Sequence, residues 1–220
     1  MKTKKYSLRL PALLLSLVML VLSTGVALAD NSDKMARFTD VLPGQMYYEA
    51  IEYVVTNGYF NGVSEDSFAP SELMTRAMLV TVLGRMAGIE AATYQSSEFT
   101  DVSADSYYSG YVAWASENGI AQGTGGGKFS PVEPVTREQI AVFLYRYARY
   151  LGMDTNPGHI ATPSTFDSDS NVSSWAIAAM VWANNKGLMR GTDSGLDPQA
   201  QVTRAEAAQM ILNFSRLTEN

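Results

Sequence analysis

Apolar residues recur three or four positions apart in six stretches of the chain, a spacing typical of helices that bury one face. The stretches alternate between two kinds. Three of them end at a glycine that fits the left-handed residue closing a helix, namely Gly58, Gly119 and Gly187. The other three begin at a threonine suited to be an N-cap, in the pairs Thr75-Arg76, Thr136-Arg137 and Thr203-Arg204. The pattern therefore predicts three helix pairs and an all-α fold.

The three helix pairs belong to one repeated unit. Each copy opens with a phenylalanine close to an aspartate, at Phe38 and Asp40, Phe99 and Asp101, and Phe166 and Asp167. Each copy also has a second glycine four residues after the first, at Gly62, Gly123 and Gly191. The opening phenylalanine and the arginine are 38 residues apart in every copy, although the third copy needs one insertion and one deletion between them. So many landmarks in one order indicate an internal repeat.

Each unit is a helix–turn–helix of about 50 residues, which is too small to bury a substantial core alone. We therefore expect the three units to share one core. The predicted division places the repeats at residues 30–88, 89–149 and 150–220, after a separate segment at 1–29.

The segment at 1–29 has the features of a secretory signal peptide. It contains four basic residues and no acidic one, then an apolar run at 12–22, and it ends in Ala27-Leu28-Ala29. The apolar run is shorter than the roughly 20 residues that span a membrane. An uncleaved N-terminal anchor is the alternative. Cleavage after Ala29 would leave a secreted chain, with no membrane contact of its own.

Composition excludes several kinds of function. The chain has no cysteine and a single histidine, His159 in a linker, so we expect no catalytic residue, no metal site and no cofactor. Cleavage would remove four of the 16 basic residues, and the remaining 12 against 22 acidic ones give a net charge of −10. Such a charge argues against a nucleic-acid partner. An enzyme acting on a glycan would need two carboxylates roughly 5–9 Å apart, but the repeat accounts for most of the acidic residues. We therefore predict that the chain is not an enzyme.

The repeated arginines need an explanation, because a cation in the first turn of a helix is unfavourable by about 0.3–1 kcal/mol. One explanation is a structural clamp, in which an internal carboxylate such as Asp40 or Asp101 holds the arginine. The other is an acidic ligand that docks against both the arginine and the free N–H groups of the helix N-terminus. The residues alone leave both explanations open.

The ordered landmarks resemble the S-layer homology (SLH) domain, whose pattern runs F-x-D-V, an aromatic residue, G-x-x-x-G, F-x-P and T-R-A-E. The best single matches are Phe99-Thr-Asp-Val102 and Thr203-Arg-Ala-Glu206. The resemblance implies three repeats in a pseudo-threefold arrangement around a central helical bundle. It also implies a secreted protein at the cell wall or cell surface, associated with the S-layer. There it would bind an acidic, pyruvylated wall polysaccharide non-covalently, in grooves between the repeats.

The resemblance also suggests site residues. By motif match, the main ligand contacts are Arg76, Arg137 and Arg204. The family's aromatic position holds Tyr107 and Trp175 in the second and third copies, and Met46 in the first. The further candidates are Gly62, Gly123 and Gly191, where a ligand could approach the backbone, together with Asp40 and Asp101. A tight turn alone explains the glycines, and core packing explains most aromatic residues, including Trp114 and Trp182.

One expectation follows from the departures in the first copy. The first copy has lost the aromatic residue, at Met46, and the glutamate of the capping box, at Met78. We therefore expect Arg76→Ala to cost less affinity than Arg137→Ala or Arg204→Ala. The alternative function is that of a small structural surface-layer subunit or adaptor, which acts mainly through self-assembly or other protein–protein contacts.

Overall fold

The computed structural model describes residues 34–94, 98–157, 171–190 and 195–218. Each repeat contributes a short helix and then a longer one. They are α2 (Tyr48–Thr56) and α3 (Arg76–Met86), α4 (Ser109–Glu117) and α5 (Arg137–Tyr150), and α6 (Ile177–Asn185) and α7 (Arg204–Thr218), with a short 3-10 helix η1 (Ala91–Thr93) between the first two repeats. The predicted all-α class is confirmed. The predicted signal peptide, His159 and Gly191 lie outside the described residues.

The helix ends follow the local chemistry that the sequence indicates. The hydroxyls of Thr75 and Thr136 accept a hydrogen bond from the backbone N–H three residues later, and Thr203 does the same for Glu206. The backbone N–H groups of Thr136 and Thr203 also donate to the side chains of Gln139 and Glu206, which completes a capping box. Thr75 lacks this second bond, because the Met78 side chain cannot accept it. The glycines after the three short helices have positive φ angles of 72°, 66° and 69°, as left-handed helix-closing residues do.

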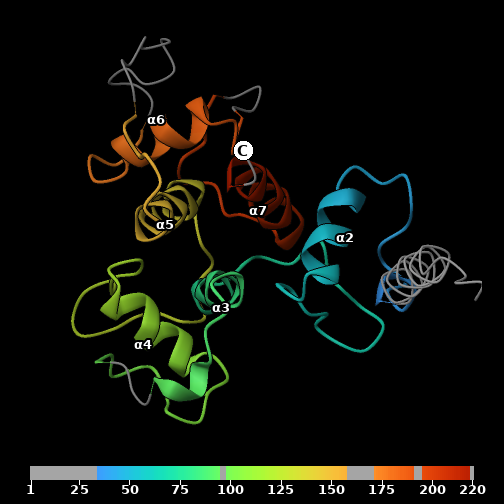
Figure 1. Ribbon diagram of the computed structural model, residues 1–220, viewed down its shortest axis with the longest axis horizontal. Helices are drawn as coiled ribbons and strands as arrows, with labels where there is room; N and C mark the ends of the chain where they lie inside the picture. Colours follow the sequence, from blue (N-terminus) through green and yellow to red (C-terminus); the bar gives the residue numbers. More distant parts are fainter. Residues whose placement is uncertain (1–33, 95–97, 158–170, 191–194, 219–220) are drawn as a thin grey trace, which may run out of the picture.

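The longer helices α3, α5 and α7 lie at the centre of the molecule and the shorter helices α2, α4 and α6 lie around them (Figure 1). Helix α4 packs on α3, α6 packs on α5, and α2 packs on α7. Each outer helix therefore contacts the inner helix of a different repeat, and the last repeat contacts the first. None of the described helices is long and apolar enough to cross a membrane.

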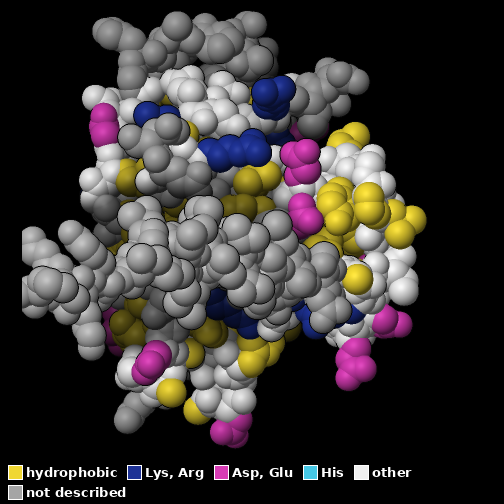
Figure 2. Space-filling model, turned by 45° about the vertical axis from the view of Figure 1, so that its right-hand side comes forward, with side chains coloured by type: hydrophobic (Ala, Val, Ile, Leu, Met, Phe, Trp, Pro, Cys, Tyr) yellow, Lys and Arg dark blue, Asp and Glu magenta, His cyan; other side chains and the backbone are white. Residues whose placement is uncertain are grey.

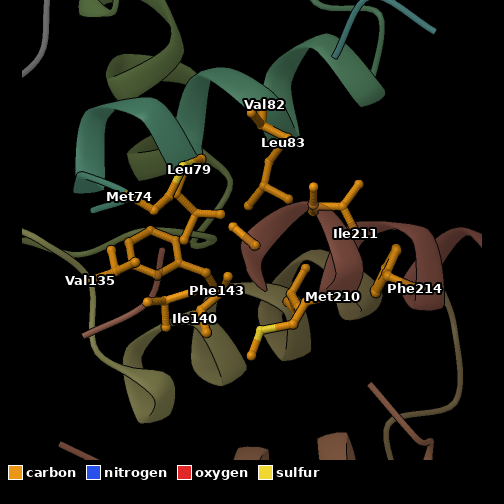
Figure 3. Packing of buried hydrophobic residues seen from close by; sticks show 14 of the residues in the cluster. Met74, Leu79, Val82, Leu83, Val135, Ile140, Phe143, Met210, Ile211 and Phe214 are labelled. Atoms are coloured by element: carbon orange, nitrogen blue, oxygen red, sulfur yellow. The ribbon is translucent and has the colours of Figure 1, made fainter. Parts of the chain in front are cut away.

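One hydrophobic core joins the three repeats. Apolar side chains of α3, α5 and α7 point toward one another at the centre (Figure 3), among them Leu83, Ile140 and Ile211, all of which are fully buried. Trp114 and Trp182 of the outer helices are also buried, as expected for core residues. The shared core predicted from the size of the repeats is confirmed.

Three backbone hydrogen bonds close a cycle where the inner helices begin. The N–H of Met74 donates to the carbonyl of Val202, that of Val202 to Val135, and that of Val135 back to Met74, at 2.8–3.0 Å. Each of these residues comes two positions before a repeated arginine. The pseudo-threefold arrangement stays a prediction, which this cyclic pattern supports.

Candidate ligand-binding grooves

The three repeated arginines make the same pair of hydrogen bonds, each with the turn of the next repeat. Arg76 donates from Nε to the carbonyl of Phe129 and from Nη2 to that of Gln122, both at 2.8 Å. Arg137 bonds Leu196 and Arg190 in the same way, and Arg204 bonds Phe68 and Asn61. All three side chains are at most 9% exposed. The third repeat thus clamps the first, and the ring of repeats is closed a second time.

The aspartates of the opening motif hold the same turns from the other side. Asp101 accepts the N–H groups of Phe129 and Ser130 at 2.8 Å. In the first repeat, Asp40 accepts the N–H groups of Phe68 and Ala69 and the hydroxyl of Ser67. The phenylalanine peptide is therefore fixed at both ends, by an aspartate at its N–H and by an arginine at its carbonyl.

This anchoring has a local reason. The residue between phenylalanine and proline has a positive φ in the first two repeats, at Ala69 and Ser130, and so does its counterpart Asp197 in the third. Non-glycine residues rarely adopt this conformation, which costs of order 1 kcal/mol or more. The hydrogen bonds from Ala69 and Ser130 to the aspartates offset that strain.

The structural-clamp explanation is therefore right about the role and wrong about the partner. Backbone carbonyls, rather than Asp40 or Asp101, accept the arginine hydrogen bonds. The expected free helix N-termini are also absent from the described inner helices. The N–H groups of Arg76 and Ala77 donate to the carbonyls of Glu133 and Pro131, and the same two positions of α5 and α7 are satisfied by the neighbouring repeat. An anion cannot dock on N–H groups that are already bonded.

The clamp hydrogen bonds use only some of the N–H donors of each arginine. A guanidinium has five N–H donors and each of these clamps uses two, so three remain. Arg76 stacks over the rings of Phe129 and Phe143 at 4.7 and 5.3 Å, and Arg204 stacks in the same way over Phe60 and Phe68. Burial lowers the pKa of Arg76 to about 10, with Asp101 partly offsetting it, so the side chain stays cationic at neutral pH.

Each arginine lies in the wall of a groove to which all three repeats contribute. The Arg76 groove has a volume of about 360 Å³ and is lined by Arg76 of the first repeat, by the glycine turn and α5 of the second, and by Trp175 of the third. Arg146 of α5 adds a second cation, and its Nη2 donates to Oε1 of Gln122 at 3.0 Å. Burial, with the nearby charge of Arg149, lowers the pKa of Arg146.

In the other two grooves the same three parts come from different repeats. The Arg204 groove, of about 460 Å³, is lined by Gly62 and α3 of the first repeat, including Arg85, and by Tyr107 of the second. Arg85, Tyr107 and Arg204 line this groove together. Partial burial and Tyr108 raise the pKa of Tyr107, and the two arginines offset part of that rise.

The Arg137 groove, of about 550 Å³, differs most from the other two. It is lined by the turn and α7 of the third repeat and by Met46 of the first. Glu206 and Asn213 stand where the Arg76 groove has Gln139 and Arg146. Arg190 and Arg216 also line this groove.

The structure brings most of the predicted site residues together. Tyr107 and Trp175 are exposed, at 62% and 57%, and stand at groove walls as the motif match implies. Gly62 and Gly123 line grooves too, but a Cβ at either position would lie within 2.7 Å of a phenylalanine ring, so close packing accounts for both glycines. Asp40 and Asp101 support the turns, and their direct contact with a ligand stays a prediction.

The expected weakness of the Arg76 site rests on a wrong premise, namely that a repeat's own landmarks share one groove. Met46 and Met78 lie in the grooves of Arg137 and Arg204, whereas Arg76 shares its groove with Trp175. Sequence reasoning also missed Arg85 and Arg146. Both are nine residues after the repeated arginine, and that recurrence was the available signal.

The surface charge is distributed locally. On the face shown in Figure 2, Lys and Arg side chains gather in a few separate places, and Asp and Glu side chains are scattered between them and along the edges. Bulk attraction to a polyanion does not follow from such a surface, so any acidic ligand must be held at individual cationic sites.

Comparison with known proteins gives one consistent family. The profile of the S-layer homology domain matches residues 37–77, 98–141 and 167–208. The chain is 30% identical over 176 residues to the surface-layer 125 kDa protein of Lysinibacillus sphaericus, covering 78% of the chain and 14% of that protein. It is 28% identical to the S-layer protein sap of Bacillus anthracis, covering 79% of the chain and 20% of the relative. An endoglucanase of Bacillus sp. (strain KSM-635) is 28% identical over 96% of the chain and 22% of the enzyme.

The chain thus spans less than a quarter of each of these relatives, so the endoglucanase's activity does not transfer through the shared region. The three profile matches together cover more than half of the chain, in tandem and in register with the repeats described above. The chain therefore belongs to the S-layer homology domain family, a family of cell-surface anchoring domains, and carries three tandem copies of the domain.

Proposed function

We propose that the chain anchors itself to the cell wall by binding an acidic, pyruvylated polysaccharide in the grooves between its repeats. The observation that carries the proposal is the composition of the Arg76 groove, which places a buried arginine, a second arginine and an exposed tryptophan around one cavity. A pyruvate ketal supplies a carboxylate on a sugar ring. Arginine suits the carboxylate, and an aromatic side chain suits the apolar face of the sugar.

The charge balance supports a local mode of binding. The polysaccharide and the mature chain would both be negatively charged, so long-range attraction would not favour the complex. Binding would depend on short-range contacts inside the grooves, which salt screens less than it screens contacts between exposed charges. We therefore expect the affinity to fall less steeply with added salt than that of a protein with an exposed basic surface.

The test compares two arginines on one helix. Arg146 lines the Arg76 groove, while Arg149, three residues later on α5, is exposed and is not among the residues that line it. Each is replaced by alanine, and binding to purified cell walls is measured with native walls and with walls from which ketals have been removed by mild acid. Arg146→Ala should weaken binding about tenfold, since a charge-assisted hydrogen bond contributes roughly 1.5–3 kcal/mol.

Arg149→Ala should bind as the unmodified chain does, and ketal removal should abolish binding in both. Equal losses for the two variants would contradict a groove site. Failure of the unmodified chain to bind native walls would overturn the anchoring function. If the chain then assembled into sheets without glycan, that result would point to a structural subunit instead.

A further inference from the structure

The position after the repeated arginine distinguishes the second repeat from the other two. It is Ala77 in the first repeat and Ala205 in the third, but Glu138 in the second. Glu138 is only 2% exposed. A buried carboxylate is costly unless its oxygens are hydrogen-bonded, so its partners indicate what it does.

Glu138 accepts three hydrogen bonds, all from the third repeat. Oε2 accepts the backbone N–H of Ser173 at 2.9 Å. Oε1 accepts the Ser173 hydroxyl at 2.9 Å and the side-chain amide of Gln199 at 2.8 Å. Two of the three bonds therefore fix a single residue, Ser173, through its backbone and its side chain together.

Ser173 begins the turn that carries Trp175. Its carbonyl accepts the N–H of Ala176 at 2.8 Å, and Trp175 lies inside this turn, just before α6. The Trp175 side chain is 57% exposed and lines the Arg76 groove. The core therefore holds little of this indole, and the turn beneath it sets where the indole stands.

We propose that Glu138 is a positioning residue that fixes Trp175 at the wall of the Arg76 groove, which makes this groove the tightest binder of the three. This inference rests on the proposed function and adds to it which groove dominates and why. The alanines at 77 and 205 cannot accept hydrogen bonds from the turns that carry Tyr107 and Met46. Only the Arg76 groove thus has this anchor among the described residues.

The expected size of the effect comes from pre-organisation. A side chain that is ordered before the ligand arrives does not have to be ordered at the expense of binding. Loss of the anchor should therefore weaken binding to the Arg76 groove by about tenfold. It should do so only when Trp175 is present, because Glu138 does not itself line the groove.

The experiment is a double-mutant cycle with Glu138→Gln and Trp175→Ala in the full chain, measured as affinity for purified cell-wall polysaccharide. Glu138→Gln keeps the shape of the side chain but loses acceptor capacity. Glu133→Gln is the matched control, since Glu133 lies in the turn just before α5 and is exposed. Glu138→Gln should weaken binding about tenfold in the unmodified chain and have no effect in the Trp175→Ala background.

A second readout needs no ligand. Trp114 and Trp182 are buried, so acrylamide quenching of tryptophan fluorescence reports mainly on Trp175. The Trp175 contribution, taken as the difference from a Trp175→Phe counterpart, should become more quenchable and less anisotropic in Glu138→Gln. Ser173→Ala, which removes only the hydroxyl bond, should change both signals in the same direction and by less.

An equal affinity loss from Glu138→Gln with and without Trp175, or unchanged quenching in a folded variant, would overturn the inference. If the unmodified chain does not bind the polysaccharide at all, the proposed function fails instead. The fluorescence of Trp175 then decides by itself whether Glu138 positions it.

Discussion

The centre of the molecule is the same in all three repeats, whereas the mouths of the grooves, meaning the exposed side chains at their walls, differ. At the centre, Arg76, Arg137 and Arg204 make the same two carbonyl hydrogen bonds with the next repeat. At the mouths, the position that is Trp175 in one groove is Tyr107 in another and Met46 in the third. The centre is therefore what every repeat needs in order to fold, while the mouths are free to differ in what they bind.

A second position in each repeat also differs between the grooves. The residue nine positions after the repeated arginine is Arg85 in the first repeat, Arg146 in the second and Asn213 in the third. All three donate a hydrogen bond to the loop beside them. The structural task is thus retained even where the charge is lost, which separates support of the groove from recognition of an anion.

The three clamp arginines should contribute equally to stability, and this would be contradicted if one of them proved dispensable. Each of Arg76→Ala, Arg137→Ala and Arg204→Ala leaves two carbonyls without their donors and removes a large buried side chain. We expect each to lower the free energy of unfolding by about 3 kcal/mol, measured by urea denaturation. Arg149→Ala, at an exposed site, should change it by less than about 0.5 kcal/mol. Binding losses in the clamp variants are interpretable only after this measurement.

The turns held by Asp40 and Asp101 should make the shared centre sensitive to acid. Burial raises the pKa of each carboxyl, but hydrogen bonds from the turn, led by the N–H of Phe68 or Phe129, outweigh it and leave the pKa below its ordinary value. A carboxyl with a lowered folded pKa stabilises the fold fully above the unfolded value of about 3.9. That contribution is lost as the pH falls through the folded pKa.

Thermal unfolding followed from pH 6 down to pH 2 should therefore show a loss of stability that begins below about pH 4. The double variant Asp40→Asn, Asp101→Asn should be less stable at pH 6 and should lose less on acidification. An identical acid profile in that variant would show that other carboxyls govern the transition.

The smallest effects are expected from the exposed side chains that differ between the grooves, and their affinity losses should follow a ranking. Trp175→Ala should weaken binding to the wall polysaccharide about tenfold, Tyr107→Ala about fivefold, and Met46→Ala less than about twofold. None should change the unfolding free energy appreciably, because all three side chains are exposed. The gain-of-function variant Met46→Trp should tighten binding by about threefold. Equal losses from the three alanine variants would mean that the mouths do not differ in function.

Much of the fold could be predicted because it depends on local chemistry. Threonine caps, glycine closures and apolar stripes are each decided within a few residues, and they predict the helix pairs. The small size of each repeat then predicts the shared core. The groove could not be assembled in this way. Which turn Arg76 clamps, its own or the next repeat's, depends on how the repeats pack, and an identical motif in all three copies is compatible with either. The role of Glu138 could not be predicted from the sequence, because its partner Ser173 is 35 residues away and no local pattern links the two.

The closed cycle through Met74, Val135 and Val202 also fixes how many repeats this architecture can hold. A solenoid grows by adding units at either end, and its stability is roughly a sum over neighbours. Here the third unit donates to the first, so no terminal edge remains among these bonds to accept a fourth copy. Deleting any one unit would leave unpaired groups on both of the others. The geometry of the cycle therefore sets the number of repeats. Removing one repeat should abolish folding, rather than lower the free energy of unfolding by a third.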